Sequence, residues 1–363
     1  MCWYSLLHHV REMYMRELLQ PPARAVEGGS VNYGLYKSSF PECNLLDIDI
    51  FGTQRPSPRW LRRLRLKEWE HIGILAESFY LGIALVDAKF LGVSWCCFFD
   101  RKSLDTVEHT RKFMPGNIKV PPDLGKGDLQ GRAGGKYVIE IQNRLREGYH
   151  RITVEIREHG GRPSFHAEVK LHERKGETQP IIALLPIGPQ RPFFTHKSAC
   201  PVEGEVRIGT RRLDLKPDRD VALLDYHRTY FPYRTHWEWA TCAGFDKRGK
   251  LIGVNLTKGI ISRDDLFNEN GVWYGNTLTP VGRVDFRIPN DPKDLWHMKT
   301  DDGAVDLTFK PQGQRMERIR VGPLTSSYTQ PFGLFSGKLR DGEGMVHTVE
   351  DMFGIAEDHV VTW

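Results

Sequence analysis

Short apolar or alternating runs, separated by glycine and proline turns, recur along most of this chain. From Trp69 to Leu215 such runs return about every 8–12 residues, and the same texture resumes near Asp218 and continues to Trp363. Many short strands at this spacing favour an all-β sandwich or barrel. Abundant glycine (35) and proline (22) also suit a turn-rich β protein. Each half could form one closed antiparallel barrel, although no strict sequence repeat relates the halves.

The expected strands follow from the positions of these runs. In the first half they are 70–75, 79–87, 89–100, 107–112, 137–143, 151–156, 165–171, 181–185, 191–199, 203–208 and 211–215. In the second half they are 235–245, 251–256, 271–274, 276–278, 281–288, 305–310, 318–322, 332–340, 346–354 and 355–363. Residues 203–215 should form a hairpin about Gly209-Thr210, and residues 235–256 should form another.

Two segments carry helical patterns instead of strand patterns. Residues 1–19 have apolar side chains at helical spacing and end before Pro21-Pro22, which predicts a short amphipathic helix. A docked or loose extension is favoured for it over a membrane or partner helix. In residues 59–69, five of the eleven side chains are Arg or Lys, which favours a solvated helix face over an anion contact. The expected organisation is an extension (1–39), a first barrel (40–217) and a second barrel (218–363).

Length and charge restrict the function classes. A chain of 363 residues suits about two domains, and 51 basic against 46 acidic residues leave a net charge of only +5. This small excess is not typical of a nucleic-acid-binding protein. No apolar run reaches the roughly 20 residues of a transmembrane segment, and charges interrupt the first 19 residues, so no signal peptide is expected. The six cysteines lack C-x-x-C spacing, which indicates reduced thiols in a cytoplasmic protein. The sequence does not rule out a peripheral contact with a membrane, but no feature of the sequence supports one.

The densest cluster of chemically useful side chains lies in residues 223–255. Asp225 and His227 are two residues apart, so on a strand they share a face, as do Trp237 and Trp239. A histidine oriented by a carboxylate can act as a general base or acid near neutral pH. The alternatives are a salt-bridged pair at a domain junction, and tryptophans that simply fill a core.

A second carboxylate–histidine pair, Glu357 and His359, lies near the C-terminus. The two pairs could meet in one cavity of an antiparallel barrel and offer an acid and a base to a ligand. Metal binding is disfavoured because no third and fourth ligands accompany them. No cofactor is expected, since the sequence has no P-loop, no G-x-S-x-G, no H-E-x-x-H and no alternating βα units.

The order and number of several motifs resemble the domain-of-unknown-function family 2804, over about residues 40–363. The resembling pieces are 65–69 (RLKEW), 79–89 (FYLGIALVDAK), 225–228 (DYHR), 232–239 (PYRTHWEW), 253–255 (GVN), 269–270 (EN), Trp296, 305–307 (VDL), 309–311 (FKP), 353–354 (FG), Glu357 and His359. That family brings no activity that can be carried over. It resembles in turn a lipocalin-like superfamily with carotenoid hydratases and cofactor-free cyclases. The resemblance implies an all-β fold of two tandem lipocalin-like (calycin-like) antiparallel β-barrels with a short N-terminal helix.

Together these observations predict a protein that binds a hydrophobic or amphipathic small molecule in an aromatic-lined β-barrel cavity. Cofactor-independent acid/base chemistry of the hydratase, isomerase or cyclase type is one reading. A non-catalytic carrier of a lipid-like ligand, or a structural protein with filled barrels, are the alternatives. The candidate catalytic residues are Asp225, His227, Glu357 and His359. The candidate ligand-binding residues are Arg228, Tyr233, Arg234, Trp237, Trp239, Asn255, Glu269, Asn270 and Trp296.

Overall fold

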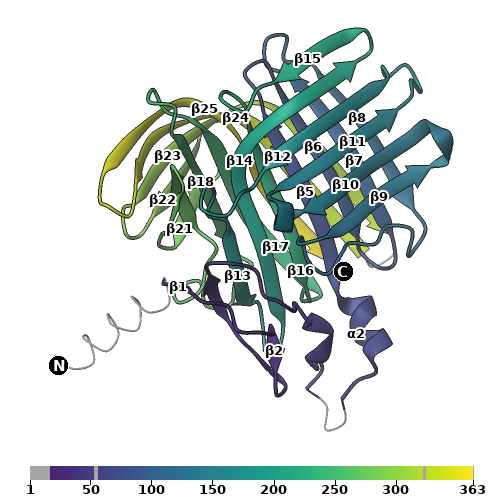
Figure 1. The fold of residues 1–363 in the computed structure, drawn as a ribbon, viewed down its shortest axis with the longest axis vertical. Coiled ribbons are helices and arrows are strands. Elements are labelled where there is room, and N and C mark those ends of the chain that lie inside the picture. The colour runs from purple at the N-terminus through teal and green to yellow at the C-terminus, as the bar shows by residue number, and fades with distance from the viewer. Residues whose placement is uncertain (1–16, 53–55, 322–323, 363) are drawn as a thin grey trace.

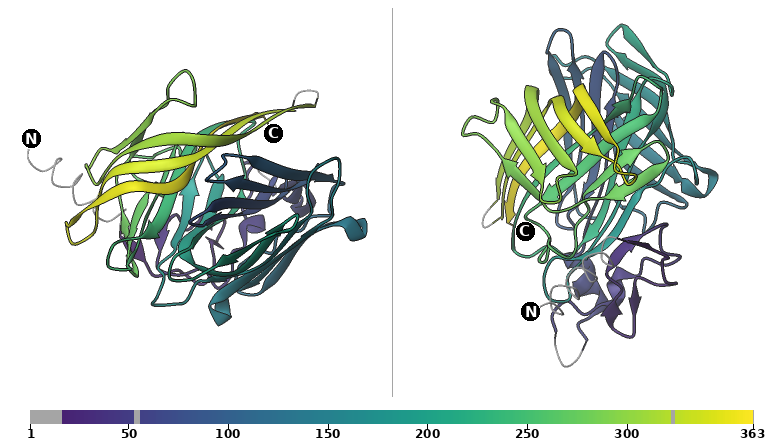
Figure 2. Two further views of the ribbon diagram at one scale, coloured as in Figure 1. Left: turned by 90° about the horizontal axis from the view of Figure 1, so that it is seen from above. Right: turned by 90° about the vertical axis from the view of Figure 1, so that its left-hand side faces the viewer.

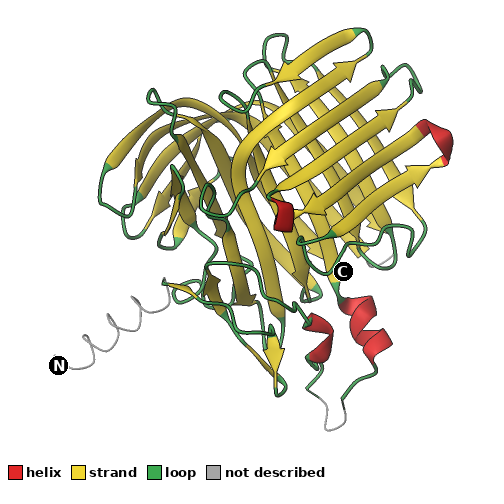
Figure 3. Ribbon diagram, in the orientation of Figure 1, coloured by secondary structure: helices red, strands yellow, loops and turns green. Residues whose placement is uncertain are grey.

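The chain folds into two large antiparallel sheets that pack side by side (Figure 1). The computed structural model describes residues 17–52, 56–321 and 324–362. The helix expected within residues 1–19 therefore lies almost wholly outside the described residues. In the part of the chain that the structure describes, helices are few and short (Figure 3). They are the 3-10 turns η1 (Leu45–Asp47), η2 (Gly134–Lys136) and η3 (Leu145–Glu147), and the helix α2 (Arg59–Arg65).

The first sheet has 14 strands and curls into a nearly closed barrel (Figure 2). Its main path, in spatial order, is β8 (Thr106–Phe113), β7 (Gly92–Asp100), β6 (Phe79–Asp87), β5 (Lys67–Leu75), β16 (Val221–Thr229), β14 (Pro192–Ile208), β12 (Phe165–His172), β11 (Tyr149–Ile156), β10 (Tyr137–Arg144) and β9 (Gly127–Ala133). Strands β1 (Leu18–Leu19), β4 (Gly34–Tyr36), β13 (Ile181–Pro186) and β15 (Arg211–Leu215) pair at its side. The two ends of this path come close together and nearly close the barrel. Strands β7 and β10, each next to one end, are in contact, since Ser94 Oγ of β7 and the Tyr137 hydroxyl of β10 are 2.7 Å apart.

The second sheet has nine strands and forms an open half-barrel. Its order is β20 (Thr277–Pro280), β19 (Gly271–Tyr274), β18 (Leu251–Lys258), β17 (Arg234–Phe245), β25 (Val346–Thr362), β24 (Leu324–Arg340), β23 (Val305–Val321), β22 (Trp296–Thr300) and β21 (Val284–Arg287). A small separate ribbon pairs β2 (Val26–Glu27) with β3 (Ser30–Val31). The all-β, tandem-barrel expectation is confirmed, with one barrel nearly closed and the other half open.

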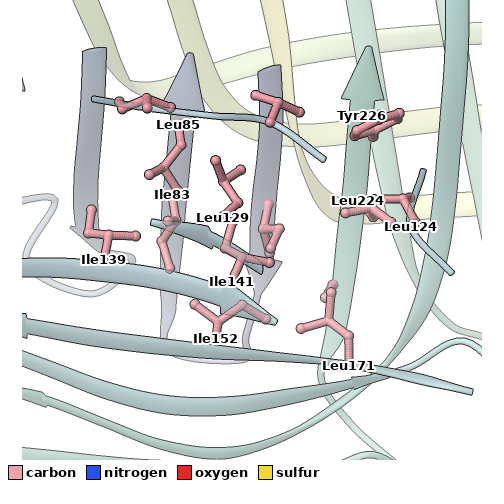
Figure 4. Close-up of a cluster of buried hydrophobic side chains, with 14 of the residues drawn as sticks. Ile83, Leu85, Leu124, Leu129, Ile139, Ile141, Ile152, Leu171, Leu224 and Tyr226 are labelled. Atoms are coloured by element: carbon pink, nitrogen blue, oxygen red, sulfur yellow. The ribbon is translucent and has the colours of Figure 1, made fainter. Parts of the chain in front are cut away.

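Aliphatic side chains fill the interior of the first barrel (Figure 4). Strand alternation produces this filling: along β10, residues 137, 139, 141 and 143 are buried while their neighbours are half-exposed. A buried polar network also lies among the barrel strands, where Glu173 accepts hydrogen bonds from His196 Nε2 and Ser198 Oγ, both at 2.6 Å. The cavity described below lies outside this packed interior.

A separate hydrophobic core lies between the two sheets and joins them into one body. Phe99 of the barrel packs against Phe332 of the half-barrel, with ring centroids 4.5 Å apart, and Tyr80 lies 5.4 Å from the same ring. Phe353 lies 6.1 Å from Tyr80 and carries the Arg101 guanidinium 4.5 Å above its ring. This aromatic contact holds together the two sheet faces that enclose the cavity described below.

The strands agree with the sequence in most positions, including both expected hairpins. Several expected pairs of strands are single long strands instead: β14, β23 and β25 each have 17 residues. Strand β16 belongs to the first sheet, where it pairs with β14 and β5. The chain therefore crosses to the second sheet between Thr229 and Arg234, later than the expected division at Asp218.

Candidate functional site

A cavity of about 410 Å³ lies between the two sheets. One wall is the outer face of the barrel, from β5 to β8, β14 and β16, and the other is the facing surface of β17, β18 and β23 to β25. Aromatic rings form much of the lining: Trp69, Phe90, Trp95, Phe193, Trp237, Trp239 and Tyr328. A mostly apolar cavity of this size with a few convergent polar groups is typical of a small-molecule site.

Strand register places three polar residues in one row on the barrel wall. Asp225 of β16 is the cross-strand partner of His71 on β5 and of Lys197 on β14. Directly opposed residues of antiparallel strands project from the same face of the sheet, so all three side chains face the cavity. The next residue on each strand, such as Tyr226, points into the barrel interior instead.

Asp225 is the centre of a tightly bonded group. Its Oδ1 lies 2.6 Å from His227 Nε2 and 2.6 Å from Lys197 Nζ, and its Oδ2 accepts a hydrogen bond from Trp69 Nε1 at 3.3 Å. Burial raises the pKa of the Asp225 carboxyl, but the charges of His227 and Lys197 outweigh burial and hold this pKa below its ordinary value. Asp225 is therefore an ionised carboxylate that orients the His227 ring.

Glu269 adds a second carboxylate to the same end of the cavity. Its Oε1 lies 3.3 Å from Lys197 Nζ and accepts a hydrogen bond from Thr257 Oγ1 at 2.6 Å. Burial lowers the pKa of Lys197, but Asp225 and Glu269 raise it above its ordinary value. The Lys197 ammonium also lies 4.8 Å from the Trp239 ring centroid. Lys197 thus links the two carboxylates as a permanent cation.

The half-barrel carries the second carboxylate–histidine group. Glu357 accepts hydrogen bonds from Trp237 Nε1 at 2.7 Å and from Gln330 Nε2 at 3.2 Å. His359 Nδ1 lies 3.7 Å from Glu357 Oε1, and its Nε2 lies 2.8 Å from Ser326 Oγ. Burial and the charge of Glu357 raise the pKa of Tyr328 well above its ordinary value, so this phenol stays protonated at neutral pH.

Arg315 is a buried cation on the cavity wall of β23. Its Nη2 lies 3.1 Å from carboxylate oxygens of both Glu108 and Glu317. Its guanidinium also lies 4.6 Å from the Trp95 ring centroid and 5.1 Å from that of Tyr328. Glu108 comes from β8 of the barrel, so Arg315 ties the two sheets together beside the cavity.

His71 lies between the two polar groups. Burial lowers the pKa of His71 to about 4. The negative charges of Asp225 and Glu357, on opposite walls, act in the other direction and raise this pKa, but burial outweighs them. The imidazole packs 5.3 Å from the Trp95 centroid and 6.1 Å from the Trp239 centroid. His71 is therefore a neutral imidazole at neutral pH.

Several buried polar atoms of the lining have no protein partner among the described residues. They are His71 Nε2, His227 Nδ1, Glu269 Oε2, Arg315 Nε, Gln330 Oε1 and His359 Nδ1. Buried polar atoms in folded proteins are nearly all hydrogen-bonded, so a group of free ones around one cavity points to recognition of a polar ligand.

The structure brings seven of the residues singled out in the sequence to this cavity. They are Asp225, His227, Trp237, Trp239, Glu269, Glu357 and His359. Asn255 lies just behind the wall, where its Oδ1 accepts from Trp239 Nε1 at 2.8 Å. Asn270 holds the chain locally, since its Oδ1 accepts from the Thr257 backbone N–H at 2.7 Å.

The other four lie elsewhere. Arg228 points away from the cavity and donates to Glu68 Oε1 at 2.7 Å. Trp296 is fully buried in the core of the half-barrel. Tyr233 and Arg234 are exposed in the crossing segment and at the start of β17. These four are not in the lining.

Sequence reasoning missed His71, Lys197 and Arg315 as parts of the site. His71 directly follows Glu70, and Lys197 lies between His196 and Ser198, so neither residue stands out from its sequence neighbours. Their partners are remote in sequence and meet them only through sheet pairing. Within residues 17–52, 56–321 and 324–362, no cluster of three or more His, Cys, Asp or Glu side chains is arranged to hold a metal ion.

Comparisons with known proteins identify a family but no activity. No curated protein matches the sequence. Among solved structures, kievitone hydratase from Nectria haematococca aligns with a TM-score of 0.49 and 9% identity, over 82% of this chain and 88% of that one. An AttH-like protein from Nitrosomonas europaea aligns with a TM-score of 0.39 and 14% identity, over 95% and 99%. Residues 16–363 match the family described as domain of unknown function DUF2804, and the chain belongs to that family.

Proposed function

We propose that the cavity between the sheets binds a largely apolar small molecule with at least one polar group, and that the protein performs cofactor-independent acid/base chemistry on it. The reaction would be of the hydratase, isomerase or cyclase type. One observation carries the proposal: two carboxylate–histidine groups, Asp225–His227 and Glu357–His359, line the same aromatic cavity from opposite sheets. Carboxylates and histidines on both sides of a bound molecule can remove a proton at one place and return it at another.

His227 is the proposed base. In its neutral form the ring donates its Nε2 proton to Asp225 Oδ1, which leaves the lone pair on Nδ1. Nδ1 is buried and has no partner within the described residues, so it is available to a ligand proton. Trp69 and Phe193 hold the ring, with centroids 4.6 Å and 4.7 Å away, and this packing fixes its direction. Asp225 and Lys197 stabilise the imidazolium that forms after proton transfer.

The half-barrel wall supplies the proposed hydrogen-bond donor. Tyr328 has a raised pKa and a neutral phenol, and it lies against Glu357 and His359. Because this phenol keeps its proton at neutral pH, it can stabilise a developing oxyanion by donating a hydrogen bond to it. The aromatic rings exclude water, which strengthens each of these electrostatic contacts.

The first experiment asks whether the cavity takes an apolar ligand. Purified protein is analysed by native mass spectrometry for a co-purified compound, and Nile red fluorescence is titrated. A stoichiometric compound, or saturable dye binding that Trp239→Ala weakens, is the expected result. A protein that carries nothing and does not bind the dye would instead indicate filled barrels with a structural role, and would overturn the proposal.

The second experiment separates an enzyme from a carrier. Variants His227→Gln and Glu357→Gln are compared with His236→Gln, a matched change on β17 whose side chain faces away and contacts Asp358. Each is incubated in D₂O with a panel of aromatic α,β-unsaturated ketones, and deuterium incorporation is followed by mass spectrometry. We expect the two site variants to lose about 100-fold or more in exchange rate with little change in dye affinity. Exchange that is absent in the unaltered protein, with dye binding intact, would favour the carrier.

A further inference from the structure

One end of the first barrel presents an unusual set of exposed apolar side chains. We define the basic rim as Trp60, Leu64, Phe90, Met114 and Tyr233, together with the cations Arg63, Lys112 and Arg234. The apolar members are 45–73% exposed: Trp60 64%, Leu64 50%, Phe90 45%, Met114 73% and Tyr233 50%. Large exposed apolar side chains that gather at one end of a sheet suit an interaction surface.

Strand pairing brings these residues to the same end of the sheet. Lys67, which follows α2 at the start of β5, pairs with Thr229 at the end of β16. Across the other neighbours, Glu68 pairs with Asp87 at the end of β6, and Gly92 at the start of β7 pairs with Phe113 at the end of β8. Helix α2, the β6–β7 turn with Phe90, Met114 and Tyr233 therefore all leave the sheet at one end (Figure 1).

Helix α2 turns its apolar side chains outward. Along its seven residues, Arg59, Trp60, Arg63 and Leu64 are exposed, which is one face at helical spacing, and no residue of the helix is buried. A surface helix normally directs Trp and Leu toward the core. Here the outward face combines two large apolar groups with arginines, and the helix has no acidic residue. This composition suits the interface of an anionic bilayer.

The rim reaches the mouth of the cavity through two of its members, Phe90 and Lys112. Phe90, Lys112 and Thr325 line the cavity and are exposed, so they mark where it opens. Lys67 Nζ lies 2.6 Å from the Ala88 carbonyl oxygen and 3.4 Å from that of Leu64, which joins α2 to the cavity wall. At the end of the helix, Arg65 donates to the Phe231 carbonyl, and the Phe231 ring stacks 5.7 Å from that of Trp237 in the lining.

We propose that the basic rim docks on the anionic phospholipid surface of a membrane, with the cavity mouth facing the bilayer. The positive charge of the rim favours an anionic phospholipid surface as its partner. Each Arg or Lys near an anionic leaflet adds about a fivefold gain in partitioning, and exposed Trp, Phe and Leu insert at the headgroup level. A ligand dissolved in the bilayer would enter the cavity without crossing water. The docking surface rests on the exposed residues alone and does not depend on the proposed chemistry.

The test is sedimentation of the full-length protein with vesicles of phosphatidylcholine alone, or of phosphatidylcholine with about 30% phosphatidylserine. Binding to the serine-containing vesicles only, reduced at high salt, is expected. Arg63→Glu and the double change Trp60→Ser with Leu64→Ser should each weaken this binding about tenfold or more. All three positions are exposed, so thermal unfolding should stay unchanged and should verify that the variants fold.

Matched controls lie on hairpin turns of the half-barrel. Arg248→Glu reverses an exposed charge, and Met345→Ser removes an apolar side chain that is 52% exposed. Both should bind vesicles as the unaltered protein does. The proposal is overturned if the unaltered protein ignores both kinds of vesicle, if the controls weaken binding as much as the α2 variants, or if the protein binds soluble polyglutamate instead, which would indicate an acidic protein partner.

Discussion

His71 shows how one buried side chain can link the two walls of the cavity. It lies in a row with Asp225 and Lys197 on the barrel, and it also experiences the charge of Glu357 from the half-barrel. Because burial keeps the imidazole neutral, its free Nε2 can accept or donate one hydrogen bond, depending on the tautomer. His71 therefore offers the ligand a neutral polar contact among charged groups.

This environment predicts a pH-dependent stability that His71→Gln should remove. The imidazole has a pKa of about 4 when folded and 6.5 ordinarily, so between these values the unfolded chain takes up a proton that the folded chain does not. The folded state should lose about 3 kcal/mol from this residue as the pH falls from above 6.5 to 4. Urea unfolding of both proteins at pH 7.5, 5.5 and 4.5 measures the difference. Parallel pH profiles would show that His71 titrates normally in the fold.

At the scale of the strand, alternation separates residues that line the cavity from residues that hold the barrel. On β16, Asp225 and His227 face the cavity, while Tyr226 and Arg228 face the barrel interior. Arg228 donates to Glu68 at 2.7 Å and to the Cys43 carbonyl at 2.8 Å. Residues 225–228 therefore contribute two side chains to the cavity wall and two to the barrel interior.

The Arg228→Met variant should therefore destabilise the protein without impairing the cavity. Removing one partner of a buried ion pair typically costs about 3–5 kcal/mol, and here Glu68 Oε1 and the Cys43 carbonyl would each lose a buried donor. Nile red affinity should change less than about twofold under conditions where the variant is folded. Lys197→Met on neighbouring β14 is the comparison, since its side chain does face the cavity, and it should weaken binding of a polar ligand. Equal effects of both changes on binding would contradict the face assignment.

Period-two patterns explain which parts of the architecture were predictable. The spacing of Asp225 and His227 correctly predicted a shared face, and the hairpin of β17 and β18 followed from its apolar runs and glycine turn. The middle of β23, residues 311–317 (PQGQRME), looks like a polar loop in sequence. It is a strand because Arg315 and Glu317 face the polar cavity wall, a context that only the packing of the second sheet supplies.

For the whole molecule, the cavity exists only because two sheets are held at a fixed distance. Neither sheet contains it: the barrel interior is packed, and the half-barrel has its own core around Trp296 and Phe309. Long-range contacts of this kind have no local sequence signal, which is why an intra-barrel cavity was the expectation. The spacing depends on the aromatic contact of Phe99, Tyr80 and Phe332 beside the cavity.

Phe332→Ala tests whether this contact maintains the cavity, with Phe309→Ala as its matched control. Both rings are fully buried, so each truncation should lower the free energy of unfolding by about 3–5 kcal/mol. Phe309 packs inside the half-barrel, 4.5 Å from the Phe335 ring, and its loss should leave dye affinity nearly unchanged. Loss of Phe332 lets the two walls shift and should weaken dye binding severalfold at the same degree of folding. If the two variants bind the dye equally well, the sheets keep their spacing without Phe332, and the ion pair of Arg315 with Glu108 becomes the contact that sets it.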